Sequence, residues 1–591
     1  MKKTILDGND FFKLFSYGAS EVISNRDKLN KINVFPVADG DTGNNLVFTL
    51  NSVLDYAEVK DSVYETLKSM AEASLSGARG NSGVIFAQYI AGLASETKGK
   101  ASIMLHDFAN ASKNSAYGLY NALSNPVEGT MLTVIKDWSN YIVDNHKNYD
   151  SFDDLFEESV GYASKSLDNT KEQLEILKKN DVVDSGAKGF VLFLEGALRY
   201  LRGEVLPEIK RFSLSDLSAS HDSLIHEESS YRYCTECILK GNLPTTDVVK
   251  ETLIAYGDSL IVAGNEDFKH VHIHTDRVSD FFKAISKLGN ISRPKVDDIF
   301  IQEKLNDKKG TTAIVTDSIG DIPKNLIDKY MIHQIPLNIT VGEDSYLDKV
   351  SISSEDFYEY MKSSPIYPNS SLPNEIQIKE KLEFLSQNYE NIIIINVSSK
   401  LSGTHSAMLK ASKELIDYGY PIKVIDSKVN SAVQGLLVLH AAKMADSGST
   451  MEEITDYLND KIPKSEIYVA LNTFRNALNS GRLPKIVGKI GIFFRLRPII
   501  SIDREGNGSA FSVAFSKTTL INKILKLVNQ KNQQSKISSY CIVHSGDLDT
   551  ANSFAKEVTN ILGYEPEYIC EISSVTALHA GEKAVAIGFI R

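Results

Sequence analysis

The stretch Asn391-Ile-Ile-Ile-Ile-Asn-Val397 is a short run dominated by β-branched residues, and the hydroxyl-rich loop Ser398-Ser-Lys-Leu-Ser-Gly-Thr404 follows it directly. Such runs are typical of strands that are buried on both faces of a parallel sheet. Ligands bind to such sheets beyond the carboxyl ends of the strands. We therefore predict an α/β fold for this part of the chain. Similar runs, each followed by a loop and a helical stretch, occur at Thr312–Thr316, Ile422–Ile425 and Tyr540–Val543.

The chain before about Arg202 has a different pattern, with apolar residues spaced three and four apart in segments such as Asp61–Ser74 and Ser151–Leu167. This spacing predicts an all-α region. A serine-rich stretch over residues 212–230 is typical of a linker. A small α+β region follows, with strands expected near Tyr231–Leu239, Ser259–Ala263 and His270–Thr275. Glycine-rich polar loops interrupt the helices at Ala38–Asn45, Gly77–Gly83, Asn125–Thr130 and Asp184–Gly189.

The composition is that of a globular protein with several domains, since 591 residues are too many for one core and hydrophobic residues make up 42%. The formal net charge of -12 disfavours a nucleic-acid partner. No stretch approaches the roughly 20 apolar residues that an integral membrane segment needs. Four cysteines are too few for a disulfide framework. The first residues lack a signal-peptide pattern, so we expect a cytoplasmic protein.

The loop around Asp39-Gly-Asp41 places two carboxylates two residues apart on a glycine turn. Mg²⁺ prefers oxygen ligands and is usually held by one or two carboxylates together with substrate phosphates. An Asp-Gly-Asp motif that occurs on its own is more often an ordinary Asp-Gly turn. Here a second small-residue loop, Gly77–Gly83, precedes the helical stretch Val84–Ala94. Backbone amides at such a helix start can bind anions.

Four blocks in the all-α region resemble the nucleotide-binding (DhaL) domain of the dihydroxyacetone kinase family. They resemble the ATP-binding subunit of bacterial fatty acid kinase more closely. The blocks are NVFPVADGDTGNN at 33–45, SGARGNSGVIFAQ at 76–88, PVEGTMLTVI at 126–135 and VVDSGAKGF at 182–190. The resemblance implies a DhaL-type helical barrel that binds ATP and Mg²⁺ at one end.

The same resemblance implies roles for individual residues. Asp39 and Asp41 would hold Mg²⁺ and be catalytic, with Asn33 close by. The residues expected to contact the phosphates are Thr42, Asn44, Asn45, Gly80, Asn81 and Ser82, and those expected around the nucleoside are Thr130, Met131, Asp184, Gly186 and Ala187.

The small α+β region contains Cys234-x-x-Cys237 and, further on, His270-x-His272-x-His274. Residues two apart on a strand share a face, so we expect the three histidines to point the same way. Cysteine and histidine suit tetrahedral zinc, whereas the alternative is two reduced thiols and a strand with exposed histidines. The segments resemble the middle domain of fatty acid kinase, which implies a cluster of Cys234, His272 and His274. It also implies a docking or homodimerisation role.

Spaced blocks after residue 311 resemble the DegV family of fatty-acid-binding proteins. They include Val315-Thr-Asp-Ser318, the Ser398–Thr404 loop and His544-Ser-Gly-Asp547. A carboxylate at the mouth of an apolar tunnel needs donors, since an unpaired buried charge is costly. The resemblance implies that Arg482 steadies charge on a transferring phosphoryl group. It implies that the fatty acid carboxylate is bound by Ser370, Ser371, Ser402, Gly403 and His579.

Two segments depart from the DegV pattern. Ser370-Ser371 stands where the family usually has threonine-serine, and Gly581-Glu-Lys583 stands where it usually has Gly-Pro-Gly after the late histidine. The second departure predicts added charge next to the proposed carboxylate site.

Together these observations predict a helical kinase domain at 1–205, a middle domain at 220–308 and a DegV-like domain at 311–591. The last of these occupies the place of the usual C-terminal domain of the ATP-binding protein of fatty acid kinase. The predicted activity is transfer of the ATP γ-phosphoryl group to the carboxylate of a bound fatty acid. Two alternatives stay open: a fatty-acid-binding or sensing protein without turnover, and a kinase for another small hydroxylated substrate.

Overall fold

The computed structural model describes residues 2–35, 42–78, 80–122, 126–205, 231–264, 266–306, 310–479 and 496–591. Asp39, Asp41, Arg482 and the predicted linker lie outside these ranges. The chain forms two compact units. Unit 1 comprises Met1–Arg277 and Ala284–Asp297, and unit 2 comprises Val278–Lys283 and Asp298–Arg591. The predicted boundaries of three domains stay predictions.

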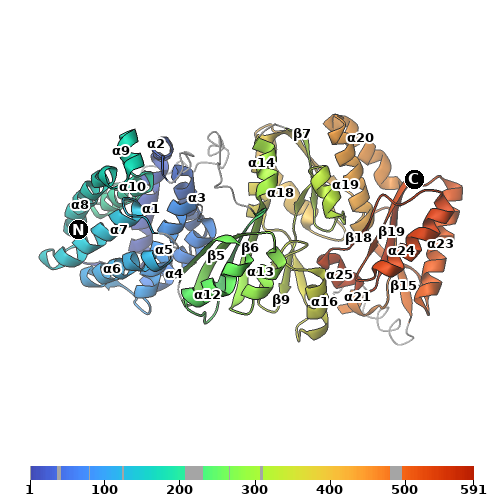
Figure 1. Ribbon diagram of the computed structural model, residues 1–591, viewed down its shortest axis with the longest axis horizontal. Coiled ribbons are helices and arrows are strands. Elements are labelled where there is room, and N and C mark those ends of the chain that lie inside the picture. The colour runs from blue at the N-terminus through green and yellow to red at the C-terminus, as the bar shows by residue number, and fades with distance from the viewer. Residues whose placement is uncertain are drawn as a thin grey trace. The chain divides into compact units, whose positions relative to one another are not determined.

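The first part of unit 1 is helical, as predicted, and is drawn in blue to teal in Figure 1. Its helices pack around an aromatic centre that includes Trp138, Phe152 and Phe190, all almost fully buried. The elements are β1 (Ile5–Leu6), α1 (Gly8–Ser24), α2 (Arg26–Lys31), α3 (Thr42–Tyr56), α4 (Val63–Gly77), α5 (Gly80–Glu96), β2 (Ile103–Met104), α6 (Leu105–Ala122), α7 (Met131–Asn145), η1 (His146–Asn148), α8 (Phe152–Gln173), α9 (Glu175–Asn180) and α10 (Ser185–Leu201).

The middle region forms a four-stranded sheet in the order β4-β5-β3-β6. The three predicted strands are present, whereas β6 was not predicted, because its sequence NISRPKVDD is polar and contains a proline. The elements are β3 (Tyr233–Lys240), α12 (Thr246–Leu253), η3 (Ile254–Tyr256), β4 (Asp258–Gly264), β5 (Phe268–Thr275), α13 (Val278–Ile285), β6 (Asn290–Asp298) and α14 (Ile299–Asn306).

The rest of unit 2 contains the predicted parallel sheet, in the order β13-β12-β7-β8. Its strands end at one edge, so the loops after β7, β12 and β13 lie at the same edge, as expected. A three-stranded sheet, β10-β9-β11, lies in the same part of the sequence. The elements are β7 (Gly310–Asp317), α15 (Lys324–Lys329), β8 (His333–Ile335), β9 (Asn338–Val341), β10 (Asp344–Leu347), α16 (Ser354–Ser363), β11 (Asn369–Ser371), α17 (Glu375–Asn388), β12 (Tyr389–Asn396), α18 (Thr404–Asp417) and β13 (Ile422–Asp426).

One of the four strand runs, Tyr540–Val543, does not join the parallel sheet. It forms β17 in a second, mixed sheet of six strands in the order β16-β15-β14-β19-β17-β18, where only the β17–β18 pair is parallel. The elements are α19 (Ser431–Asp446), α20 (Met451–Lys461), η4 (Ile462–Lys464), β14 (Ser465–Ala470), α21 (Arg475–Asn479), β15 (Arg497–Ile502), β16 (Gly508–Ala514), α23 (Lys517–Gln534), β17 (Ser539–His544), α24 (Leu548–Leu562), β18 (Ile569–Glu571), α25 (Ser574–Ala580) and β19 (Val585–Ile590).

Helix α19 joins the parallel sheet and the mixed sheet of unit 2, since it packs against β7 of the former and against β17 and β19 of the latter. Its side chains are buried on nearly every side over its first three turns, as a helix enclosed by other elements requires. No helix in the described ranges has both the length and the hydropathy that crossing a lipid bilayer demands.

Candidate functional site

The starts of four helices, α3, α5, α7 and α10, meet in the helical part of unit 1. Gly80 at the start of α5 has a φ of +55°, and a Cβ there would lie 2.3 Å from Asn45 Nδ2 of α3. A Cβ on Gly186 of α10 would lie 2.8 Å from Ser82 Oγ of α5 and 3.3 Å from Met131 Cε of α7. Glycine at both positions therefore allows four predicted nucleotide loops to approach one another.

The start of α3 is held by hydrogen bonds between short polar side chains. Thr42 Oγ1 donates to Asn33 Oδ1, and both residues are buried. Asn30 accepts from the backbone N–H of Asn44 at 3.2 Å and donates to its side-chain oxygen at 3.1 Å. These contacts orient Thr42 and Asn44 at the start of α3, next to the segment that carries Asp39 and Asp41 in the sequence.

Asp184 caps α10 from a buried position. Its Oδ1 accepts from the backbone N–H of Ala187 at 2.7 Å. Burial raises the pKa of the Asp184 carboxyl to about 6, against the opposing effect of hydrogen bonds from the backbone of Ala187 and Met131. Thr130 directly precedes α7. Its side chain does not cap this helix but donates a hydrogen bond to Val127 O.

The predicted nucleotide residues thus fall into one group in space. Backbone amides at convergent helix starts form a partly positive surface that suits phosphate oxygens. Asn81 is exposed at this surface, whereas most of the other predicted nucleotide-binding residues are buried or half-buried. Convergent helix starts of this kind suit a ligand that carries phosphate groups.

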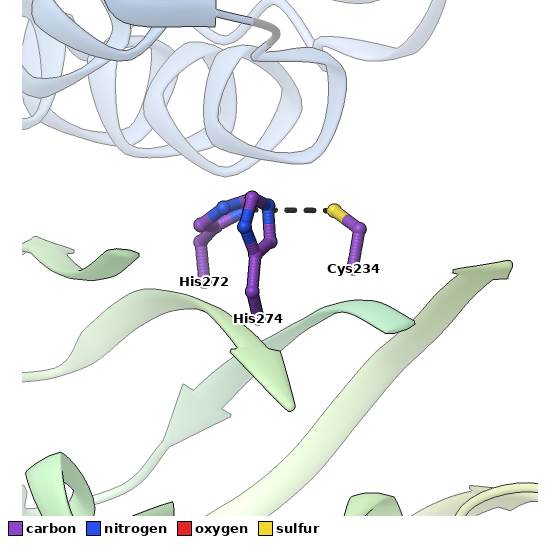
Figure 2. Close-up of side chains that lie close together, drawn as sticks. All are labelled: Cys234, His272 and His274. Carbon is purple, nitrogen blue, oxygen red and sulfur yellow. Dashed lines mark hydrogen bonds between the residues drawn. The ribbon is translucent and has the colours of Figure 1, made fainter. Parts of the chain in front are cut away.

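The middle sheet brings Cys234 of β3 next to His272 and His274 of β5 (Figure 2). Their ligand atoms all lie within 4.8 Å of one another. Cys234 Sγ is 3.8 Å from His272 Nδ1. His272 Nδ1 is also 3.0 Å from Glu236 Oε1. The predicted cluster is therefore assembled, and Glu236, which the sequence analysis did not single out, joins it.

Glu236 is half-buried beside this cluster. Burial opposes its charged form, but contacts with His270 and His272 and the nearby Lys295 hold the pKa of the Glu236 carboxyl well below its usual range. All three histidines share one face of β5, as predicted, and His270 Nε2 lies 3.8 Å from Glu236 Oε2. Cys237 belongs to the opposite face and is buried.

The histidine-bearing face of the middle sheet packs on the helical part of unit 1. Ile238 of β3, Ala263 of β4 and Phe268 of β5 belong to the same apolar core as the helices. Lys240 of β3 forms an ion pair of 2.9 Å with Glu72 of α4. The Cys234–His272–His274 cluster therefore lies on the sheet face that is turned toward the helical part.

A cavity of about 430 Å³ lies in unit 2, within the range of small-molecule sites. Its walls are mostly aliphatic and come from segments within or just after strands of all three sheets of unit 2. The apolar lining includes Leu337, Val397, Leu401, Ile467, Val469, Leu471, Ile500, Ile502, Val543, Val575 and Val585.

Polar groups line part of the same cavity, and three of them are predicted site residues: Ser370, Ser402 and His579. Ser402 Oγ is 2.8 Å from Thr404 Oγ1 and also accepts from the Thr404 backbone N–H. Ser371 follows Ser370 on β11, is exposed and does not line the cavity. Gly403 is also absent from the lining, and a Cβ there would lie 3.3 Å from a methyl group of Leu372.

The cavity wall also contains polar groups that were not predicted, among them Lys400 and His544. Lys400 lines the cavity yet is exposed, which puts a cation at the mouth. His544 lines the wall, and its Nδ1 lies 2.7 Å from Glu571 Oε2. Tyr358 donates to the other oxygen of Glu571 at 2.5 Å. His544, Glu571 and Tyr358 come from three distant segments, so no spacing in the sequence could reveal their contact. Lys400, by contrast, lies in the SSKLSGT loop, and its place in that predicted ligand loop could have indicated that it lines the site.

The charged segment after His579 is tied down. Glu582 forms an ion pair of 2.6 Å with Lys362. Lys583 adopts a φ of +60° and donates its backbone N–H to Ser545 O.

Three family models match consecutive parts of the chain. They are the DAK2 domain over residues 36–199, the fatty acid kinase-like middle domain over residues 230–305, and the DegV family, described as uncharacterised, over residues 311–591. The chain therefore joins a DAK2 domain, a fatty acid kinase-like middle domain and a DegV domain in one polypeptide.

Relatives share parts of this chain. An uncharacterised protein of Staphylococcus epidermidis is 33% identical over 342 residues, which cover 54% of this chain and 62% of that protein. One of Staphylococcus haemolyticus is 28% identical over 468 residues, which cover 72% of this chain and 83% of that protein. The chain thus spans less than two thirds of the S. epidermidis relative.

Solved structures resemble about half of the chain. A stearic acid-binding protein from Eubacterium ventriosum is 23% identical with a TM-score of 0.45, covering 48% of this chain and 98% of its own. DegV from Bacillus subtilis, described as a fatty acid binding protein, is 24% identical with a TM-score of 0.44, covering 48% of this chain and 99% of its own.

Proposed function

We propose that this protein is a fatty acid kinase that transfers the γ-phosphoryl group of ATP to the carboxylate of a fatty acid carried by the same chain. The observation that carries the proposal is the cavity of about 430 Å³, aliphatic in its walls and lined at polar positions by Ser370, Ser402 and His579. It lies in a chain whose other unit brings the starts of four helices together.

The acyl chain would occupy the aliphatic part of the cavity, where each buried methylene contributes about 0.8 kcal/mol. Its carboxylate would accept hydrogen bonds from the hydroxyls of Ser370 and Ser402 and from His579. Neutral hydroxyl donors hold the carboxylate without over-stabilising its charge before transfer. Lys400 at the mouth adds a long-range attraction for the acid.

On the other substrate, the backbone amides near Gly80 and Ser82 would bind the phosphates, and Met131, Asp184, Gly186 and Ala187 would surround the nucleoside. The proposed Mg²⁺ ligands are Asp39 and Asp41. When bound, Mg²⁺ supplies charge neutralisation to the β- and γ-phosphates.

The reaction requires little proton transfer. A carboxylate oxygen of the fatty acid attacks the γ-phosphorus, a new O–P bond forms, and the bond from the γ-phosphorus to the bridging oxygen breaks. ADP leaves with the electron pair, and the product is an acyl phosphate. Because the carboxylate is already ionised at neutral pH, catalysis is positioning and charge stabilisation, to which Arg482 is proposed to contribute.

The Cys234, His272 and His274 cluster fits zinc, because one thiolate and two imidazoles are ligands that Zn²⁺ prefers and their atoms already lie within 4.8 Å. The Glu236 carboxylate would fix the orientation of His272. We propose that a zinc ion here has a structural role, since it would link β3 to β5 on the sheet face that packs on the helices. We also propose that the protein forms homodimers.

The test of the proposal is acyl phosphate formation by the purified full-length chain with oleate and MgATP. Asp41→Asn should abolish turnover while oleate binding stays unchanged. The matched control is Asp168→Asn, which changes an exposed aspartate on α8 and should keep wild-type turnover.

Full turnover by Asp41→Asn would overturn the metal assignment. Oleate binding by the wild type without any phosphorylation would favour a carrier or sensor instead. Phosphorylation of dihydroxyacetone in place of oleate would favour a kinase of small hydroxylated substrates.

A further inference from the structure

Helix α25, which carries His579, is held at its start by two carboxylates from the parallel-sheet side of unit 2. Asp321 accepts from the backbone N–H of Ser573 at 2.8 Å. Asp348 accepts from the backbone N–H of Ser574, also at 2.8 Å. Both carboxylates are fully buried. Two consecutive amides at one helix start thus have partners that are more than 220 residues away in the sequence.

The Asp321 carboxylate is itself fixed. Lys349 Nζ lies 2.7 Å from Asp321, and Ser431 Oγ donates to Asp321 at 2.5 Å. Lys349 and Ser431 both adopt a left-handed backbone, with φ of +63° and +49°. Non-glycine residues in this region are strained, and such strain persists where the surrounding structure enforces it and is concentrated at functional sites. Ser431 also lines the cavity.

The last turn of α25 is held from the same side. Tyr367 donates its hydroxyl to Leu578 O at 2.7 Å, one residue before His579. The hydroxyl of Tyr367 accepts from Asn476 Nδ2 at 3.0 Å. Tyr367 stands three residues before Ser370, the serine of β11 that lines the cavity. One short segment therefore carries a cavity serine and grips the backbone beside the cavity histidine.

We propose that Asp321, Asp348 and Tyr367 are positioning residues that fix α25 so that His579 meets the ligand carboxylate together with Ser370 and Ser402. The inference rests on the proposed binding of fatty acids. None of the three need touch the ligand, because each acts on the backbone of the helix that carries His579. Their loss would remove the recognition of the carboxylate while the aliphatic walls stay intact.

The experiment compares binding of oleic acid with binding of oleyl alcohol, which has the same chain without the carboxylate. We expect His579→Ala to weaken oleic acid binding by roughly 10-fold or more, since a hydrogen bond to a charged group is worth about 1.5–3 kcal/mol. Tyr367→Phe and Asp348→Ala should weaken it similarly. Binding of the alcohol should change by less than about twofold in all three variants.

A double-mutant cycle separates positioning from general destabilisation. Adding Tyr367→Phe to His579→Ala should cause no further loss of oleic acid affinity, because both changes remove the same interaction. The matched control is Ser516→Ala, which removes the side-chain cap of α23, a helix that does not line the cavity. It should lower stability without changing the ratio of acid to alcohol affinity.

The outcomes are distinct. A wild type that binds neither ligand overturns the proposed function and this inference with it. A wild type whose preference for the acid depends on His579 but survives Tyr367→Phe and Asp348→Ala overturns the positioning role alone. Additive losses in the cycle, or equal losses of acid and alcohol binding, do the same. Tyr367→Phe keeps the ring and is the informative variant if Asp348→Ala fails to fold.

Discussion

At the residue scale, Asp184 shows how a buried carboxylate links the proposed nucleotide site to stability. Burial lifts the pKa of its carboxyl from 3.8 to about 6 in the folded protein. The folded state therefore binds more protons than the unfolded state between these values, and stability falls as the pH rises through this window. Above it, the charged carboxylate costs roughly 3 kcal/mol.

Asp184→Asn should remove this cost. Asparagine caps helices about as well as aspartate, so the contact with Ala187 is kept. We expect the free energy of unfolding of the variant to exceed that of the wild type by about 2–3 kcal/mol near pH 7.5. Near pH 5 this difference should be smaller by about 1–2 kcal/mol. Urea unfolding followed by fluorescence of Trp138, the single tryptophan, reports on the helical part. A stability difference that does not change with pH would contradict the assignment.

The Cys234 cluster gives a second prediction at this scale. The purified chain should contain about one equivalent of zinc, and Cys234→Ser should lose most of it, as measured by elemental analysis. Cys237→Ala is the matched control, since Cys237 lies on the same strand but on the opposite face. Equal metal content in wild type and Cys234→Ser would remove zinc from this site.

At the scale of elements, the contacts of glycines explain why the helix starts can meet. Gly80→Ala must place a side chain at a φ of +55° and push aside Asn45. Gly99→Ala meets the same kind of backbone strain at +76°, but nothing lies within 4 Å of its Cβ. Both should destabilise the helical part by about 1–2 kcal/mol.

Only Gly80→Ala should also weaken binding of MgATP, by about 10-fold or more, because only there is the proposed phosphate surface disturbed. Calorimetric titration of both variants with a non-hydrolysable ATP analogue measures this. Equal ATP affinity in the two variants would place the nucleotide elsewhere.

The elements also show what the sequence could predict. Helical spacing before Arg202 and the β-branched runs at Thr312–Thr316 and Asn391–Val397 were sufficient for the fold class, because burial on one or both faces dictates such patterns. The run Tyr540–Val543 looks the same, yet β17 lies in the mixed sheet, since the choice of neighbour depends on long-range pairing with β19. The place of Ser402 in the cavity wall could be anticipated, because this residue lies in a short motif after a predicted strand. The contact of Glu571 with His544 and Tyr358 was not, because it joins three distant segments.

At the scale of the whole molecule, the two proposed substrate sites share one chain. A tether raises the effective concentration of the carried acid at the nucleotide site to the order of millimolar when it can span the gap. We therefore expect transfer within one chain to dominate at nanomolar protein concentration.

A mixture of two inactive full-length variants tests this. Asp41→Asn should lack phosphoryl transfer and Ser402→Ala should bind the acid poorly, so a mixture can react only between chains. We expect less than about a tenth of wild-type turnover from the mixture at nanomolar concentration, rising as both proteins are concentrated. Wild-type turnover at every concentration would show that the carrier half serves other chains freely.

The cavity in unit 2 has walls contributed by segments of both the parallel sheet and the mixed sheet, and α19 packs against these two sheets. The alkyl chain of a bound ligand would fill this cavity and complete an apolar core that the polypeptide alone leaves hollow. Loading should then protect both sheets against proteases together, and by a margin that grows with the logarithm of free guest concentration. The resistance of the protein to unfolding would thus report whether a fatty acid is bound in the cavity.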